Sequence, residues 1–484
     1  IHIKFSPLLD PYRYMIGKYN IDDVRLKQMP RFDSNIDTVH PKILTVHNAS
    51  YVDSFFSFLT SILLNKMNFI HGTDFYGSYL AIKNDLNIDV CDDIDSYSCN
   101  DFFQEKINNL FHFINSDHEE IINQNSRRNK KAIEIGEEIS LDNLVLDELV
   151  TDDLHTDSSQ NICLKSDLIL CDNNATNNAK INTSLKSLSS KTECSSRSSN
   201  TNEDAYDSDT DTSYTTSDNS NQSSSEEDSS DVENIMVSIN DFPIQIIALE
   251  RCKDTLDSLL SNDMINDNEL GCAMAQVLMI LITYQKMFTF THNDLHTNNI
   301  MYIETEKKYL YYKVNDRHYK IPTNGKIFKI IDYGRAIYKF NGHLMCSDSF
   351  HRDGDANSQY NCEPYFNENK PRLDPNPSFD LCRLGCSIYD FISEKYESIK
   401  EIKNPIHKLI INWCIDDDGN DILYKANGEE RYPDFKLYKM IARKVNKHKP
   451  IDELKKQYFE RFVVSRKSIK KGSFICNIDE LKHQ

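Results

Sequence analysis

The stretch that decides the fold is T-H-N-D-L-H-T-N-N-I-M-Y-I, residues 291–303. Its first half is polar and contains Asp294 and Asn299, and its second half is apolar and predicts a strand. A carboxylate and an amide five residues apart in a tight loop can face different ways. We expect the carboxylate to orient an attacking hydroxyl group and the amide oxygen to bind a metal ion such as Mg²⁺.

Two later stretches supply further acids. F-K-I-I-D-Y-G-R-A, residues 328–336, places Asp332 after an apolar strand as a second metal ligand, and Gly334 allows a sharp turn behind it. S-F-D-L-C-R-L-G-C-S-I-Y-D-F, residues 378–391, places Asp380 at the start of an apolar helix. Because an unpaired acid there is costly, we expect Asp380 to accept backbone N–H bonds from the 291–299 loop.

Residues 1–100 predict strands at 2–5 and 68–82 with a helix between them. The helix covers 50–67, where apolar side chains recur every three or four residues, and Ser50 is its expected N-cap. Further on we expect a strand at 242–252, a short helix at 255–260 and a long buried helix at 271–290. Residues 309–325 read as an additional hairpin, and the remainder to residue 484 as helices and loops.

The composition changes between residues 116 and 235. This segment is rich in Ser, Asn and Asp, and within 201–232 it contains ten acidic residues and no Lys or Arg. Such a sequence buries too little apolar surface to offset the entropy lost on ordering, so it predicts a disordered insert.

The whole chain has 484 residues and a net charge of −20, which argues against a nucleic-acid-binding protein. No apolar run reaches 18 residues, so we expect no membrane span. Thirteen cysteines without a CxxC pair indicate free thiols in a reducing, intracellular compartment. Cys382 and Cys386, four apart on one helix, are expected to be buried apolar residues rather than a metal or redox pair.

The three motifs together resemble the signature set of the protein kinase superfamily. They are H-x-D-x-x-x-x-N at 292–299, D-Y-G at 332–334 and D-x-x-x-x-G at 380–385, in the usual order. The sequences of residues 2–19, 291–303 and 377–391 are most similar to serine/threonine protein kinases of giant nucleocytoplasmic large DNA viruses. The resemblance covers residues 1–100 and 236–440. If the chain is viral, its expected location is the host cytoplasm or the virion.

The resemblance implies a two-lobed α+β kinase-like fold that uses ATP and Mg²⁺ to phosphorylate Ser or Thr of protein substrates. The small lobe would comprise 1–115 and 236–252, interrupted by the insert, and the large lobe 253–484. The resemblance implies catalytic roles for Asp294, Lys4 and Asn299. Lys4 would also bind the phosphates and pair with Asp53, and Glu250 to Cys252 would face adenine through their backbone. Asn299 and Asp332 would bind the metal ion, and the residues with structural roles would be His292, Gly334, Asp380 and Gly385.

Several positions depart from the family pattern. No glycine-rich loop is present, so the resemblance places that loop and the first two strands before Ile1. Asn293 stands where many protein kinases have arginine, and His296 where they have lysine; histidine there is usual in aminoglycoside- and lipid-type kinases. Asp53 stands where the family usually has glutamate, and its shorter side chain favours a pseudokinase. Two alternatives therefore stay open: a small-molecule kinase, and a pseudokinase that binds partners without catalysis. Lys4 and Asp53 could also be ordinary surface residues.

Overall fold

The computed structural model describes residues 1–91, 94–114, 235–393 and 401–483. These residues form a mixed α+β fold with four small sheets and helices of very different lengths. Apart from Ile235, the predicted acidic insert at 116–235 lies outside the described residues.

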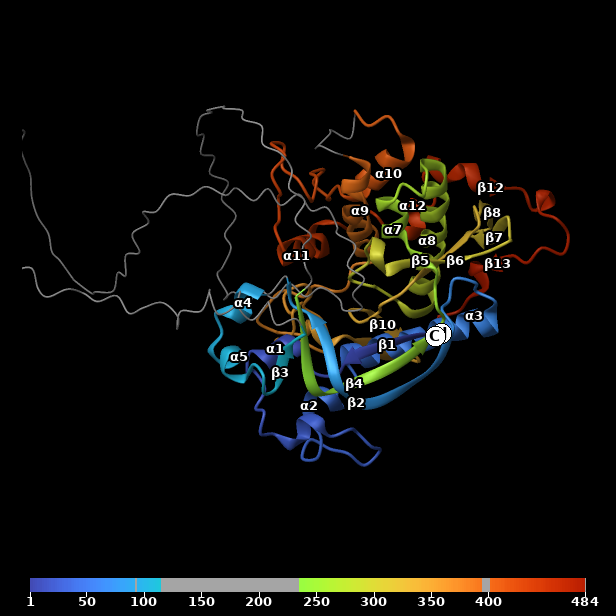
Figure 1. Ribbon diagram of the computed structural model, residues 1–484. Helices are drawn as coiled ribbons and strands as arrows, with labels where there is room; N and C mark the ends of the chain where they lie inside the picture. The colour runs from blue at the N-terminus through green and yellow to red at the C-terminus, as the bar shows by residue number, and fades with distance from the viewer. Residues whose placement is uncertain (92–93, 115–234, 394–400, 484) are drawn as a thin grey trace, which may run out of the picture. The chain divides into compact units, whose positions relative to one another are not determined.

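The first sheet is antiparallel and has the strand order β1-β4-β2, with β3 also paired to β4. Figure 1 shows β1 (His2–Pro7), β4 (Met236–Leu249) and β2 (Phe75–Asp89) side by side. The short strand β3 (Phe111–Phe113) pairs with the first residues of β4. Within the edge strand β1, Lys4 lies opposite Ile247 of the neighbouring strand β4.

Strand β2 begins later than the sequence predicts. Residues 68–74 form the turn after the preceding helix, where Asn68 takes a left-handed conformation with φ of 54°. Gly72 must be a glycine in this turn, because a Cβ atom there would lie 2.2 Å from the Thr60 carbonyl oxygen. The apolar residues of this stretch, such as Phe69, are buried without belonging to a strand.

Helix α3 (Ala49–Met67) matches the predicted helix almost residue for residue. Its apolar face buries Val52, Phe56 and Leu63. The predicted N-cap was wrong: Asn48 caps the helix, and its side chain accepts a hydrogen bond from the Ser50 N–H at 3.0 Å. Ser50 instead lies inside the helix, where its hydroxyl donates to the Pro7 carbonyl at 2.6 Å.

Helix α8 (Asp267–Phe288) is the long buried helix predicted from the sequence. Asn266 and Glu269 form a capping box at its start, which satisfies the first free N–H groups. By length and composition alone α8 could cross a membrane, but 89% of its apolar stretch is buried inside the protein. It therefore serves here as the core helix around which neighbouring elements pack.

Most of the remaining helices lie near α8 or near the first sheet (Figure 1). They are α1 (Pro11–Met15), α2 (Pro41–Leu44), α4 (Ile94–Ser98), α5 (Asp101–Lys106), α7 (Leu256–Ser261), α9 (Phe379–Ile392), α10 (Pro405–Trp413), α11 (Phe435–Lys444) and α12 (Pro450–Glu453). Helices α10 and α12 contact α8, while α9 contacts α10 and α11. Gly385 on α9 allows close packing against α10, because a Cβ atom there would lie 3.1 Å from the Ile410 carbonyl oxygen.

The other three sheets are small. One has the order β5-β6-β9, with β5 (Asp254–Thr255), β6 (Ile300–Glu304) and β9 (Lys326–Ile330). The predicted hairpin is present as β7 (Tyr309–Val314) and β8 (Arg317–Pro322), and β12 (Val463–Val464) and β13 (Cys476–Asn477) extend it. The last sheet pairs β10 (Ile337–Phe340) with β11 (His343–Cys346).

The pairing of β6 with β9 decides where the polar motifs lie. Strand β6 starts directly after the 291–299 loop, and Ile300 is opposite Ile330, the last residue of β9. The Ile331 N–H also donates to the Asn299 carbonyl at 3.0 Å. Asn299 and Asp332 therefore lie at the same end of two neighbouring strands.

Candidate functional site

Lys4 is the centre of an ion-pair cluster that joins three distant parts of the chain. Its Nζ lies 2.8 Å from Asp53 Oδ2 on α3 and 2.9 Å from Asp332 Oδ1 after β9. The lysine is only 18% exposed and the Asp53 side chain 4%. Neither residue is thus an ordinary surface residue, and the pairing expected between them is present.

Asp53 has a second partner. Its Oδ1 accepts a hydrogen bond from the Tyr333 N–H at 2.8 Å. One carboxylate on α3 therefore holds both the lysine of β1 and the backbone of the D-Y-G motif. Since the side chain of Asp53 is nearly excluded from water, both contacts are stronger than their equivalents at a surface.

The turn after β9 is made by Asp332 and not by Gly334. Asp332 has a φ of 62°, a left-handed conformation that non-glycine residues seldom adopt, whereas Gly334 does not lie in that region. The Gly334 N–H donates to Asp332 Oδ1 at 3.4 Å. Because aspartate tolerates this conformation through such local bonds, the conformational freedom expected of Gly334 is not what turns the chain.

Charge pairing outweighs desolvation in this cluster. Burial alone would favour the neutral form of Lys4, but Asp332 and Asp53 hold its pKa well above the usual lysine value. Burial would likewise raise the pKa of Asp332, yet the ammonium of Lys4 lowers it. Lys4 and Asp332 are therefore both charged at neutral pH.

The 291–299 loop is fixed by hydrogen bonds to Asp380. Its carboxylate accepts hydrogen bonds from the His292 N–H at 2.9 Å and the Asn293 N–H at 2.9 Å, as its sequence position led us to expect. His292 is fully buried, and its Nε2 lies 2.9 Å from the Ile331 carbonyl. Asn293, with φ of 65°, is a second left-handed residue. Backbone strain of this kind gathers at functional sites when the surroundings enforce it.

Asn299 is oriented by its amide nitrogen. Its Nδ2 lies 2.9 Å from the Asp294 carbonyl oxygen and 3.1 Å from His296 Nε2. Burial lowers the pKa of His296 to about 4, so its ring is neutral at pH 7 and Nε2 can accept that bond. Within the described residues Asn299 Oδ1 accepts no hydrogen bond, which leaves this oxygen available as a ligand.

Asp294 is surrounded by two arginines and one tyrosine. Burial would raise its pKa, but Arg335, with Nη1 3.9 Å from Asp294 Oδ2, holds the pKa far below the usual value together with His296 and Arg383. Asp294 Oδ1 accepts a hydrogen bond from the Tyr438 hydroxyl at 2.7 Å. Tyr438 was not foreseen from the sequence, because it lies 144 residues away in a helix that carries no motif.

The adenine-facing role expected of Glu250 to Cys252 depends on backbone groups. The Glu250 side chain is engaged elsewhere: its Oε2 lies 2.6 Å from Lys329 Nζ, and Lys329 is 1% exposed. Within the described residues the Glu250 carbonyl and the Cys252 N–H have no hydrogen-bond partner, so they can pair with a ligand. Burial raises the pKa of the Cys252 thiol to about 11, which makes it an unreactive neighbour. The pair of Lys329 with Glu250 was not predicted, although a lysine within the apolar stretch before Asp332 indicates that this side chain needs a partner.

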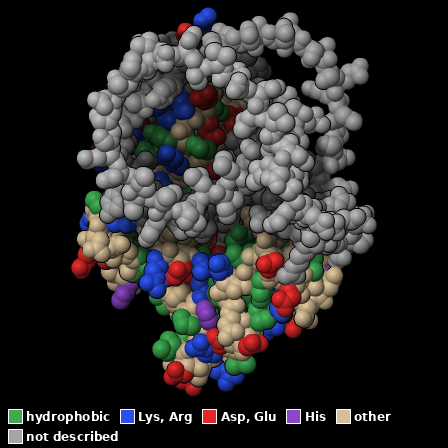
Figure 2. All heavy atoms as spheres, turned by 90° about the vertical axis from the view of Figure 1, so that its left-hand side faces the viewer, with side chains coloured by type: hydrophobic (Ala, Val, Ile, Leu, Met, Phe, Trp, Pro, Cys, Tyr) green, Lys and Arg blue, Asp and Glu red, His purple; other side chains and the backbone are tan. Residues whose placement is uncertain are grey.

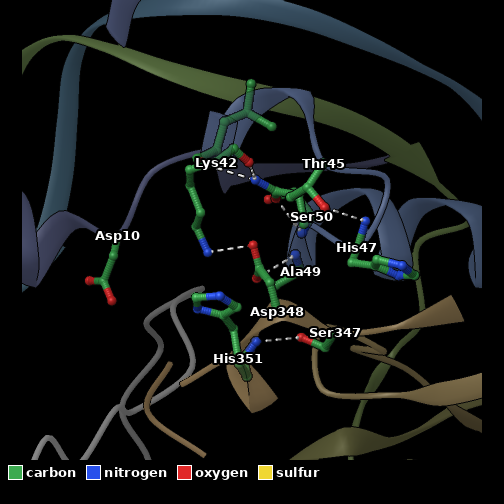
Figure 3. Close-up of polar contacts among 12 residues, drawn as sticks. Asp10, Lys42, Thr45, His47, Ala49, Ser50, Ser347, Asp348 and His351 are labelled. Carbon is green, nitrogen blue, oxygen red and sulfur yellow. Dashed lines mark hydrogen bonds and ion pairs between the residues drawn. The ribbon is translucent and has the colours of Figure 1, made fainter. Parts of the chain in front are cut away.

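A further contact ties the segment after β11 to the start of α3. Figure 3 shows Lys42 and Asp348 pointing toward one another, with Nζ and Oδ2 2.6 Å apart. The other carboxylate oxygen accepts the Ala49 N–H at 3.1 Å, and the Asp348 N–H donates to the His47 carbonyl at 2.7 Å. This carboxylate at the N-terminus of α3 also has a favourable orientation toward the helix dipole.

The same segment is fixed near the 291–299 loop by two more contacts. Arg335 pairs with Asp355 at 2.5 Å, and the Tyr360 hydroxyl donates to Asn293 Oδ1 at 2.8 Å. The short polar side chain of Asn293 is thus held by a hydrogen bond from a tyrosine. An arginine at this position would need an anionic partner instead. Tyr360 in turn packs against Phe350, with ring centroids 5.5 Å apart.

The donors available for a divalent ion are hard oxygens. Asp332 Oδ2 and Asn299 Oδ1 lie at the same strand ends, and their chemistry fits Mg²⁺. Among the described residues, no group of three or more His, Cys, Asp and Glu side chains could hold a metal ion. A magnesium ion at this place would therefore complete its coordination with water or phosphate oxygens.

The charge of the visible surface is mixed. On the face shown in Figure 2, basic and acidic side chains of the described residues alternate without forming one broad patch of either sign.

Neither a protein-family model nor a curated protein matches the chain. The geometry of the site is consequently the basis for any functional assignment.

Proposed function

We propose that this chain is a protein-kinase-like phosphotransferase that transfers a phosphoryl group from ATP to Ser or Thr of protein substrates. The observation that carries the proposal is the double ion pair of Lys4 with Asp53 and Asp332, which unites residues up to 328 positions apart. In the proposed two-lobed arrangement, residues 1–115 and 236–252 form the small lobe and 253–484 the large lobe. This lysine links the two.

Each residue of the site has a role in the proposed reaction. Lys4 binds phosphate oxygens, and its fixed charge is supported by the two carboxylates beside it. Asp294 accepts a hydrogen bond from the acceptor hydroxyl and orients it. Asn299 and Asp332 offer oxygen ligands to magnesium. When bound, Mg²⁺ neutralises charge on the phosphates of ATP.

Two other functions have an observation in their favour. A neutral His296 bonded to Asn299, in place of a lysine, favours a small-molecule kinase of the aminoglycoside type. A pseudokinase is favoured by the tyrosine that caps Asp294. The aspartate at position 53 no longer favours a pseudokinase, because it reaches Lys4 at 2.8 Å despite its short side chain.

The test uses the full chain with Asp332→Asn, Lys4→Met and the matched surface control Asp263→Asn. Mg·ATP binding is measured by calorimetry, and phosphoryl transfer with casein and with an aminoglycoside mixture as acceptors. We expect Asp332→Asn to reduce transfer about 100-fold or more, since loss of the metal ligand removes several kcal/mol of charge stabilisation. The control should retain full activity.

The outcomes separate the three functions. Near-normal transfer by Asp332→Asn with an unchanged melting temperature would contradict the assignment of the metal ligand. Mg·ATP binding without any transfer would favour the pseudokinase, and transfer to aminoglycosides alone would favour the small-molecule kinase.

A further inference from the structure

Tyr438 holds the position that an incoming acceptor would need. The Tyr438 hydroxyl donates to Asp294 Oδ1 at 2.7 Å, within the 2.6–3.2 Å range expected between a general base and the hydroxyl it orients. The same hydroxyl accepts a hydrogen bond from Arg383 Nε at 2.9 Å. Burial raises the pKa of Tyr438 to about 12, so its hydroxyl stays protonated and can donate to Asp294.

The contact also closes access to the carboxylate. The Asp294 side chain is 13% exposed, and its second oxygen faces Arg335. The guanidinium groups of Arg335 and Arg383 lie over the Tyr438 ring, 5.6 and 5.2 Å from its centroid. A substrate hydroxyl therefore competes with Tyr438 for Asp294 Oδ1.

Helix α11, which carries Tyr438, is weakly anchored at its first turn. Its N-cap residue, Asp434, has a φ of 54° and makes no side-chain capping bond, and residues 425–430 before it are exposed. Ile441 and Ala442, in the second half, are fully buried, whereas Phe435, Leu437 and Tyr438 in the first turn are only half-buried against the same core cluster. Because an uncapped turn with half-buried side chains opens at lower free-energy cost than a fully buried one, the first turn of α11 can move while the second half stays packed.

We infer that Tyr438 is an internal occupant of the acceptor-hydroxyl subsite, and that the first turn of α11 must move away before a protein substrate can bind. This inference rests on the proposed phosphotransferase function. It makes Tyr438 a specificity-determining residue, since only an acceptor segment able to displace the tyrosine gains access to Asp294.

The first experiment measures catalysis. Wild type, Tyr438→Phe and Tyr438→Ala are compared using casein as the acceptor at saturating Mg·ATP. The matched control is Tyr424→Phe, which removes an equivalent tyrosine hydrogen bond, to Asp390 at 2.9 Å. We expect Tyr438→Phe to lower the KM for casein about fivefold, the effect of losing one competing hydrogen bond, with Mg·ATP affinity unchanged.

The second experiment works without catalysis. Carboxyl groups are labelled with a water-soluble carbodiimide and an amine, and the modification of Asp294 is quantified by mass spectrometry relative to the exposed Asp263. We expect Tyr438→Ala to accelerate Asp294 labelling about threefold or more, because protection follows the population of the closed state. Tyr424→Phe should label like the wild type, and melting temperatures verify that each variant is folded.

The results distinguish this inference from the function it rests on. An unchanged or raised KM in Tyr438→Phe, or a fall in kcat alone, would overturn the inference and make Tyr438 a residue that positions Asp294. If no variant transfers phosphate, the proposed function fails, and labelling still decides the placement of Tyr438. Equal labelling of Asp294 in wild type and in a folded Tyr438→Ala variant would refute the inference that Tyr438 occupies the acceptor-hydroxyl subsite. If Tyr438→Ala does not fold, the same comparison is made with Tyr438→Phe.

Discussion

The Asp348 carboxylate should fasten the segment after β11 to helices α2 and α3. Replacing it in Asp348→Ala removes a 2.6 Å contact to Lys42 Nζ and a 3.1 Å bond from the Ala49 N–H. The Asp348 side chain is only 7% exposed, so water cannot simply take its place. The backbone bond from the Asp348 N–H to the His47 carbonyl survives the substitution.

The expected cost follows from these contacts. A hydrogen bond to a charged group contributes about 1.5–3 kcal/mol, and removing one partner of a buried ion pair costs about 3–5 kcal/mol. Lys42 is 29% exposed and can turn toward solvent, which reduces the cost of leaving it unpaired. We therefore expect Asp348→Ala to lower the free energy of unfolding by about 2–3 kcal/mol. Asp348→Asn, which keeps an acceptor for the Ala49 N–H, should lose about half as much.

The assay is urea denaturation of the full chain, followed by circular dichroism and by tryptophan fluorescence of Trp413. The control is Asp353→Ala, five residues away, whose side chain is 58% exposed and should change stability by no more than about 0.5 kcal/mol. A loss below about 1 kcal/mol in Asp348→Ala, or an equal loss in the control, would show that this contact does not fasten the segment.

Two further predictions concern pH and the segment outside the described residues. Burial lowers the pKa of His71 from 6.5 in the unfolded chain to about 4 in the folded state. The contribution of this residue to the free energy of unfolding is therefore fully present above pH 6.5. It falls by up to about 1.4 kcal/mol per pH unit as the pH drops toward 4. His296 adds a fall in the same direction, so the readout is a shallower pH dependence of the urea midpoint in His71→Gln than in the wild type; identical slopes would contradict the assignment. The Ile114 N–H donates to the Met236 carbonyl at 3.0 Å, so the two ends of the 115–234 segment are adjacent, and a short Gly/Ser linker in its place should leave the melting temperature within a few degrees. A large drop would show that the segment stabilises the fold.

Local sequence patterns predicted those parts of the fold that depend on local interactions. The helices at α3 and α8 and the β7–β8 hairpin follow directly from the spacing of apolar residues. The error at the start of β2 has a physical reason: Phe69 and Ile70 read as the beginning of the apolar strand, but the C-terminus of α3 needs a left-handed residue and a tight turn there. Apolar content alone does not distinguish a buried turn from a strand.

The candidate site was predictable to the extent that its residues lie in short motifs. Asp294, Asn299 and Asp332 each belong to a recognisable stretch, and Asp380 was expected to bind the loop backbone as it does. Tyr438 and Asp348 belong to no motif. Each contact of these two depends on how distant elements pack, which a single sequence does not encode in any local pattern.

Asp53 shows how tertiary packing compensates for a residue that seems too short. The family that the chain resembles usually has glutamate at this position, and the side chain of Asp53 is shorter than that of glutamate. Here the first turn of α3 is fastened to the end of β1, because the Ser50 hydroxyl donates to the Pro7 carbonyl at 2.6 Å and accepts from Ser6 at 2.8 Å. This fastening lies only a few residues from both Lys4 and Asp53 and brings helix and strand close together. The shorter carboxylate then reaches the lysine at 2.8 Å and the D-Y-G backbone as well, so Asp53→Glu should crowd this cluster and not improve it.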